Sequence, residues 1–150
     1  MKDTPIFEYN VLIQEIHLDS FGHVNNAAYV MLYEQARWDF ITKHGFGLDY
    51  IQKHQVGPVI LDLNVRFKRE LKNREWIKIT SKVIEVVSSK ILILEQQMIN
   101  EESKISSEAK FTIGFFDLKE RKLIPASEEW LEAVGVKLGV QNEPLIKASK

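Results

Sequence analysis

The feature that most constrains the fold is that only one segment has the pattern of a long helix. Between residues 26 and 43, apolar side chains recur every fourth position at Ala28, Leu32, Ala36 and Phe40. This spacing places them on one face and predicts an amphipathic helix. Lys43, His44 and Gly45 follow, a basic last turn and a glycine that are typical of a helix C-terminus.

Strand-like segments lie on both sides of this helix. One precedes it, at residues 6–13, and four follow it, at residues 59–68, 76–87, 91–99 and 105–116. In the first of the four, polar residues alternate with an apolar series made of Leu61, Leu63, Val65 and Phe67. The later connections are short and polar, as antiparallel hairpins require. Two short helical segments are also expected, at residues 48–54 and, after a Ser127 N-cap, up to Val134.

A single helix can lie across only one face of such a sheet. We therefore expect an α+β fold in which an antiparallel sheet of about five strands curls around one long central helix. The other face of the sheet, or one of its edges, then needs a cover, most simply a second copy of the chain. The expectation is one domain over residues 1–150, assembled as a homodimer or homotetramer.

Composition excludes several classes of function. The net charge is −1, so no overall positive field attracts nucleic acid, although Arg66, Lys68, Arg69, Lys72 and Arg74 form a local basic group. There is no cysteine, which removes disulfides and thiolate nucleophiles. The longest apolar run, at residues 27–33, is too short to span a membrane, and the N-terminus does not resemble a signal peptide. We expect a cytoplasmic protein without a membrane or nucleic-acid partner.

The entry to the long helix, HLDSFGHVNNAAYVMLYEQAR at residues 17–37, is crowded with polar groups. Asn25 or Asn26 suits the N-cap, and Val24 with Tyr29 suits a hydrophobic staple around it. Capping does not explain the three other polar residues of this segment, His17, Asp19 and His23.

Two chemical interpretations of these residues compete with a plain turn. A helix N-terminus offers unpaired N–H donors that can hold a developing oxyanion, and Asp19 is near enough in sequence to act as a base or nucleophile beside it. The same Asp19 also suits a turn in which it accepts local N–H bonds. A metal site at His17, Asp19 and His23 lacks a recognised ligand spacing, so none is expected. Ser20 has no nucleophile-elbow motif around it.

The run DSFGHVNNAAY followed by YEQAR closely resembles hotdog-fold acyl-CoA thioesterases of the 4-hydroxybenzoyl-CoA thioesterase-like group. Its HVNN..Y portion is also similar to acyl-ACP thioesterases, which share the fold. The resemblance covers about residues 6–125 and includes LDLNVRFKREL. It implies a hotdog fold and hydrolysis of an acyl-CoA thioester without a cofactor.

The resemblance also implies roles for individual residues. Asp19 matches the family's catalytic carboxylate, and Asn26 matches the position whose backbone N–H polarises the thioester carbonyl. His23 and Asn25 match polar residues that shape the turn. Several bacterial members carry His at the position of Asn26, so imidazole chemistry is absent there and Asp19 must act with water.

Substrate-binding candidates follow from the same resemblance. Tyr29 and Glu34 match positions on the helix, and Tyr33 either lines or merely supports the acyl tunnel. The turn Ser88, Ser89 and Lys90 resembles a phosphate-binding turn for CoA held between subunits, with Arg66 and Lys68 as second candidates. For each of these residues, an ordinary packed or solvated position is an equally simple explanation.

Three alternatives stay open. An acyl-ACP thioesterase would use the local basic group to dock an acidic carrier protein. A non-catalytic hotdog protein would bind acyl-CoA without hydrolysing it. A dehydratase acting on hydroxyacyl thioesters fits less well, because its usual His and Asp arrangement is not evident.

Overall fold

The computed structural model describes residues 3–138. Its elements, in chain order, are β1 (Phe7–Leu12), a 3-10 turn η1 (Glu15–His17), α1 (Asn26–Lys43), α2 (Leu48–His54), β2 (Val56–Phe67), β3 (Trp76–Val86), β4 (Ile91–Ile99), β5 (Ile105–Asp117), β6 (Lys122–Leu123) and α3 (Glu128–Ala133). The predicted bounds of α1 and α2 are confirmed, and those of β1, β3, β4 and β5 are met to within one residue. The turn η1 and the two-residue strand β6 were not predicted.

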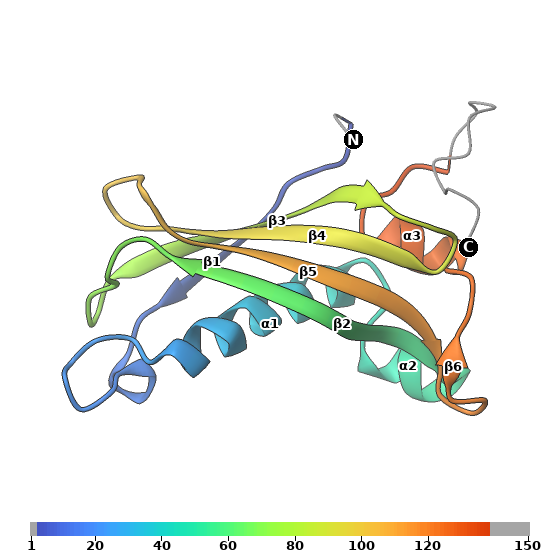
Figure 1. The fold of residues 1–150 in the computed structure, drawn as a ribbon, viewed down its shortest axis with the longest axis horizontal. Coiled ribbons are helices and arrows are strands. Elements are labelled where there is room, and N and C mark those ends of the chain that lie inside the picture. The colour runs from blue at the N-terminus through green and yellow to red at the C-terminus, as the bar shows by residue number, and fades with distance from the viewer. Residues whose placement is uncertain (1–2, 139–150) are drawn as a thin grey trace.

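The strands form one antiparallel sheet in the order β1-β3-β4-β5-β2, with β6 paired to the far end of β5. The helix α1 runs along one face of this sheet, and α2 and α3 lie at the end where α1 finishes (Figure 1). A sheet curled around one long helix is the hotdog fold, as predicted. None of the helices described here has the length and hydropathy needed to cross a membrane.

Local chemistry fixes both ends of α1. The Asn25 side chain accepts the N–H of Ala27 at 2.8 Å, so Asn25 is the N-cap and the helix begins at Asn26. At the other end Gly45 has a φ of 86°, a left-handed conformation that glycine adopts at little cost. Its N–H and that of Phe46 bond back to carbonyls of the last turn.

The buried face of α1 packs against the sheet and carries a few polar bonds inside an apolar core. The Tyr33 hydroxyl donates to Ser107 Oγ at 2.8 Å, and both residues are fully buried. The fully buried amide of Gln96, on β4, donates to the Tyr33 carbonyl and to Ser81 Oγ. These bonds satisfy polar groups that would otherwise be costly to bury, and they fix how α1 sits on the sheet.

The strand β2 differs from its prediction in two ways. It begins at Val56, three residues early, because Gly57 and Pro58 already pair with β5. A bulge between Ile60 and Asp62 then interrupts the alternation of its side chains. The predicted apolar face is therefore wrong at Leu61, whose side chain lies over Gly114 on the outer face of the sheet.

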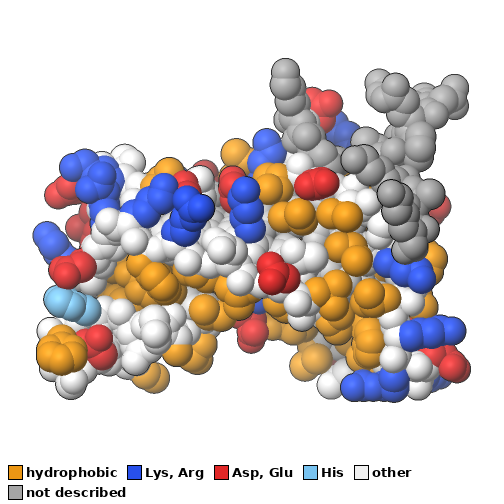
Figure 2. Space-filling view, in the orientation of Figure 1, with side chains coloured by type: hydrophobic (Ala, Val, Ile, Leu, Met, Phe, Trp, Pro, Cys, Tyr) orange, Lys and Arg blue, Asp and Glu red, His pale blue; other side chains and the backbone are white. Residues whose placement is uncertain are grey.

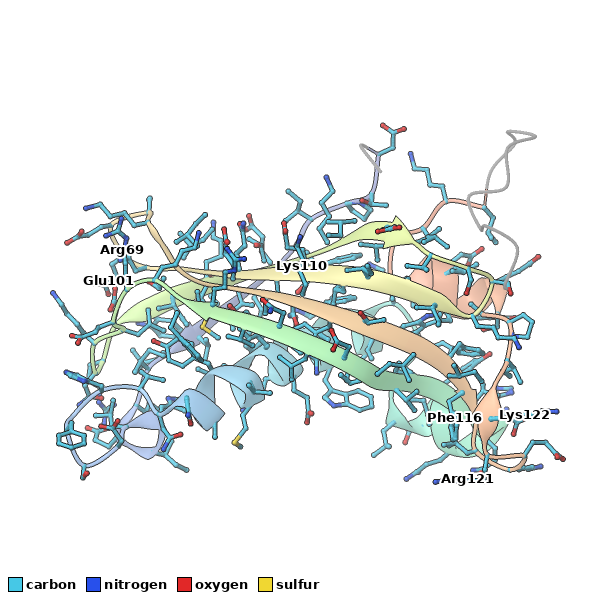
Figure 3. All side chains as sticks on the ribbon, viewed as in Figure 1. Arg69, Glu101, Lys110, Phe116, Arg121 and Lys122 are labelled. Atoms are coloured by element: carbon cyan, nitrogen blue, oxygen red, sulfur yellow. The ribbon has the colours of Figure 1, made fainter. Side chains whose placement is uncertain are left out.

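The outer face of the sheet is polar at its centre. A shallow charged hollow there is lined by Asn64, Arg66, Glu95, Glu108 and Lys110. Lys110 projects from this face in Figure 3. Because α1 covers the inner face and charged side chains line the centre of the outer one, the second copy that we expect would lie at an edge.

Candidate active site

The segment between β1 and α1 is a tight turn closed on itself by backbone bonds. Leu18 and Val24 form an isolated antiparallel bridge, and the Asn25 N–H donates to the His17 carbonyl at 2.8 Å. The Asp19 N–H donates to the His23 carbonyl at 2.7 Å. Gly22 supplies the reversal with a φ of 79°. The turn therefore holds Asp19 at a fixed place before the first residue of the helix.

The Asp19 side chain is half-buried and partly used by the turn. One oxygen, Oδ1, accepts the N–H groups of Phe21 at 2.9 Å and His23 at 3.2 Å. The other, Oδ2, makes no hydrogen bond to any residue between 3 and 138. The turn interpretation of Asp19 is thus confirmed, and it leaves one carboxylate oxygen available for chemistry.

The first turn of α1 leaves one N–H without an acceptor. The Ala27 N–H is capped by the Asn25 side chain, and the N–H groups of Ala28 and Tyr29 bond to the Asn25 carbonyl at 2.9 and 3.3 Å. Within the described part of the chain, the Asn26 N–H has no such partner. This donor, at the positive end of the helix dipole, suits an oxyanion.

Asp19 and Asn26 open onto the same hollow, which has a volume of about 560 Å³. Two parts of the chain form it. The turn and the start of α1 provide Asp19, His23, Val24, Asn25, Asn26 and Tyr29, and the end of β2 provides Phe67, Lys68, Arg69 and Glu70. Arg69 is seen at this end of the sheet in Figure 3.

The wall of the hollow is aromatic. Tyr29 is buried, and its ring meets the Phe67 ring edge to face, with centroids 4.9 Å apart. Burial raises the pKa of the Tyr29 hydroxyl, and the negative charge of Glu70 raises it further. Tyr29 is therefore a neutral packing residue at physiological pH.

His23 faces a residue that the sequence did not single out. Its Nε2 lies 3.4 Å from Glu70 Oε1, with both side chains more than half exposed. Phe67 and Glu70 were not predicted as site residues, and Arg69 was noted only as a member of the basic group. Lys68 was predicted, with Arg66, as a second candidate for the CoA phosphates, and it does border the hollow. Because these residues lie over 40 positions from Asp19, no local pattern links them to the motif.

Several predicted substrate-binding residues lie away from this hollow. Tyr33 is in the core, and burial raises the pKa of its hydroxyl. Glu34 borders a separate cavity further along α1, and Arg66 lies on the outer face of the sheet. The turn of Ser88, Ser89 and Lys90 joins β3 to β4 at the opposite end of the sheet (Figure 1).

The three polar residues that a metal site would use, His17, Asp19 and His23, each contact a different group. His17 Nδ1 accepts the Gln14 N–H at 2.9 Å, while Asp19 serves the turn and His23 faces Glu70. No group of three or more such side chains that could hold a metal ion occurs in the described residues.

A comparison with family models matches residues 11–134 to the Thioesterase-like superfamily. The chain belongs to this superfamily. The match includes the turn, α1 and all five long strands except the first residues of β1.

Named relatives of this Thioesterase-like chain are thioester hydrolases. Long-chain acyl-CoA thioesterase FadM of Escherichia coli (strain K12) is 25% identical over 122 residues, which are 81% of this chain and 92% of FadM. Acyl-CoA thioester hydrolase YbgC of Escherichia coli O6:H1 is 23% identical over 115 residues, 77% of this chain and 85% of YbgC.

Solved structures agree with the fold. The probable thioesterase YbaW from Escherichia coli superposes with a TM-score of 0.75 at 28% identity, covering 87% of this chain and 99% of YbaW. The Staphylococcus aureus protein SAV2348, solved in complex with CoA, gives a TM-score of 0.81 at 14% identity, covering 95% and 92% of the two chains. At that identity the second likeness concerns the fold alone.

Proposed function

We propose that this protein is an acyl-CoA thioesterase, which hydrolyses an acyl-CoA to a free carboxylic acid and CoA. The observation that carries the proposal is the pairing, in one hollow, of a carboxylate oxygen and a helix N–H that both lack a partner in residues 3–138. These are Asp19 Oδ2 and the Asn26 N–H. The names of FadM and YbgC support the same reaction.

In this proposal the thioester carbonyl oxygen accepts the Asn26 N–H. Asp19 removes a proton from a water molecule, whose oxygen attacks the carbonyl carbon, and the resulting oxyanion is held by the same N–H. The C–S bond then breaks, and the CoA sulfur leaves as a thiol with the proton from Asp19. His23 and Asn25 shape this turn, and Tyr29 forms the wall beside it.

A covalent route uses the same two groups. Asp19 attacks the carbonyl carbon, the C–S bond breaks and CoA leaves as the thiolate, which gives an anhydride. Water then hydrolyses the anhydride to the free acid and the Asp19 carboxylate, and the proton released is taken up by the CoA thiolate. A single turnover in isotopically labelled water separates the routes, because hydrolysis of the anhydride at the Asp19 carbonyl places the label in the protein.

The test of the proposed function is Asp19→Asn. An amide oxygen can still accept the N–H bonds of Phe21 and His23, so the turn should form, but the amide cannot act as a base. We expect kcat on the best acyl-CoA to fall by at least about a hundredfold. Turnover near that of the wild type would contradict the assignment.

Asp117→Asn is the matched control. Its Oδ1 also accepts two backbone N–H groups of a turn, from Lys119 and Glu120, at 2.9 and 3.0 Å. This turn lies between β5 and β6, at the other end of the sheet from Asp19 (Figure 1). The control should keep its activity and therefore shows whether loss in Asp19→Asn comes from chemistry or from a weakened turn.

We further propose that CoA, rather than a carrier protein, is the leaving group, with its phosphates near Arg69. Of the two cations in the hollow, Lys68 is engaged by Glu108 at 2.9 Å, while the exposed Arg69 guanidinium forms no ion pair in residues 3–138. A free guanidinium binds phosphate well. Two other cations of the basic group are not available at the hollow, because Arg66 lies on the outer face and Arg74 pairs with Glu15, which weakens an extended docking surface for acyl-ACP.

The assembly we propose is a homodimer formed along β2. Within residues 3–138 this strand pairs with β5 alone, so its other edge presents backbone groups that no described strand pairs with. Ile60, Leu61, Leu63 and Phe67 on this strand are each more than two-fifths exposed. A long apolar edge is an aggregation risk unless another strand pairs with it. In such a dimer Ser88, Ser89, Lys90 and Arg66 would reach a bound CoA only from the second copy.

A further inference from the structure

A second cavity lies further along α1, under the middle of the sheet. Its volume is about 110 Å³, in the range of a roughly 150 Å³ apolar cavity that accepts a benzene ring. Apolar side chains from α1, β2, β4, β5 and α3 make most of its wall. Among residues 3–138, two charged residues border it, Glu34 and Arg37, both from α1.

Arg37 is a largely buried cation with few partners. One guanidinium nitrogen donates to Gln96 Oε1 at 3.0 Å, and the guanidinium carbon lies 4.2 Å from the centre of the Phe111 ring. No carboxylate of the described chain lies within 4.0 Å of it. A guanidinium has five N–H donors, so most of them are uncommitted. Buried charges are normally paired, and this one is not.

The pKa of Arg37 reflects the cost of burying its charge without an ion pair. Burial lowers the pKa of Arg37 to about 10, and the negative charge of Glu34, three residues earlier on the helix, opposes this shift. Glu34 is exposed and forms no ion pair within residues 3–138. The cavity therefore offers hydrogen-bond donors on one residue and an acceptor on the other.

An apolar track of β2 side chains lies between this cavity and the hollow at Asp19. On β2, Leu63 and Val65 pair with Phe111 and Ala109, which are buried beneath α1, so these β2 side chains face the helix. The hollow reaches this face at Phe67 and the cavity at Ile60. Figure 2 shows hydrophobic side chains gathered along this side of the molecule, between the sheet and the helix.

The length of the track sets the size of a ligand that uses both ends. Arg37 lies 11 residues after Asn26 on α1, which is about 16 Å along the helix axis. A short or aromatic acyl group with its carbonyl at Asn26 does not reach that far, whereas an extended long acyl chain does.

We propose that Arg37 and Glu34 bind a hydroxyl group near the far end of a long acyl chain, so that the enzyme prefers ω-hydroxyacyl-CoA to the plain acyl-CoA of equal length. The inference rests on the proposed function. A hydroxyl group fits both residues, since it accepts from the guanidinium and donates to the carboxylate. A terminal carboxylate would meet the negative charge of Glu34, and a methyl end would leave the guanidinium donors unpaired.

The kinetic test compares dodecanoyl-CoA with its ω-hydroxy derivative, and hexanoyl-CoA with its own. We expect kcat/KM to favour the hydroxylated long chain about tenfold or more, because a hydrogen bond to a charged group is among the strong ones. The short pair should show no preference, because its hydroxyl falls short of Arg37. Equal rates for the long pair, or the same preference in the short pair, would overturn the proposal.

Arg37→Met tests the residue, and Lys43→Met is its control. Met keeps an unbranched apolar stem but has no guanidinium, so the preference for the hydroxylated long chain should fall toward one. Lys43 lies on the same helix, is exposed and pairs with Asp39 at 2.9 Å, so its variant should keep the preference. An undiminished preference in folded Arg37→Met would contradict the assignment.

A binding measurement tests the proposed function and this inference separately, and it does not require Arg37→Met to fold. Trp38 and Trp130 border the cavity, so their fluorescence reports its occupation in Asp19→Asn or, if no hydrolysis occurs, in the wild type. Tighter binding of the ω-hydroxy long-chain thioester without hydrolysis would overturn the proposed function and support this inference. Hydrolysis with equal binding of both thioesters would overturn this inference alone.

Discussion

The Tyr33 hydroxyl shows how one residue of the motif region belongs to the core rather than to the hollow. It donates to Ser107 Oγ in a fully buried pair. Tyr33→Phe should lower the free energy of unfolding in urea by about 1 kcal/mol, because Ser107 Oγ is left buried without its donor. The double variant with Ser107→Ala should cost less than the sum of the two single variants. Strictly additive costs would show that the bond contributes nothing.

Arg69 is the residue that we propose binds the CoA phosphates, and a substrate without those phosphates tests this role. Arg69→Gln should raise KM for acyl-CoA by about two- to fivefold, the effect of one exposed charge, and added salt should shrink the difference. KM for the matching acyl-pantetheine, which lacks the nucleotide phosphates, should not change. Lys110→Gln, an exposed cation on the outer face of the sheet, is the control. Equal effects on both substrates would remove Arg69 from phosphate binding.

At the scale of elements, the turn before α1 depends on Gly22. An added methyl group at Gly22 would touch nothing within 4 Å, so Gly22→Ala carries only the backbone cost of a positive φ, about 1 kcal/mol. We expect that loss of stability together with a lower kcat/KM, because relaxation of the turn moves Asp19 away from Asn26.

Gly45 offers a closely matched control for this prediction. Its φ is 86°, an added methyl group is equally unobstructed, and it lies at the far end of α1. Gly45→Ala should lose similar stability by thermal or urea unfolding but keep kcat/KM. If both variants lose activity alike, the effect reports stability rather than the position of Asp19.

The helices show what pattern alone predicts. The spacing of Ala28, Leu32, Ala36 and Phe40, an Asn cap at the start and Gly45 after the end predicted α1 at both ends, because capping and amphipathicity act within a few residues. The bulge in β2 was not predictable in this way. It depends on pairing with β5, more than 40 positions later, so Leu61 was assigned to the wrong face.

At the scale of the whole molecule, we propose that assembly occurs along the free edge of β2. Leu61→Lys places a charge on that edge, which disfavours strand pairing. We expect light scattering to report a dimer for the wild type and a monomer for this variant. Trp76→Lys makes the same kind of change at another exposed apolar residue, on β3, and should stay dimeric. A monomeric wild type, or a dimer unaffected by Leu61→Lys, would contradict assembly along β2.

The sequence by itself determined the long helix, the strands and the two residues on which the proposed chemistry rests. Asp19 and Asn26 lie close together along the chain, so turn and capping chemistry bring them together without help from the rest of the fold. Only the tertiary structure placed Phe67, Lys68, Arg69 and Glu70 opposite them. It also showed that Arg66 lies on the outer face and that the turn of Ser88, Ser89 and Lys90 lies at the opposite end of the sheet. The physical reason is that strand order and register arise from contacts between distant segments, and a one-residue bulge is enough to change which side chains face the site.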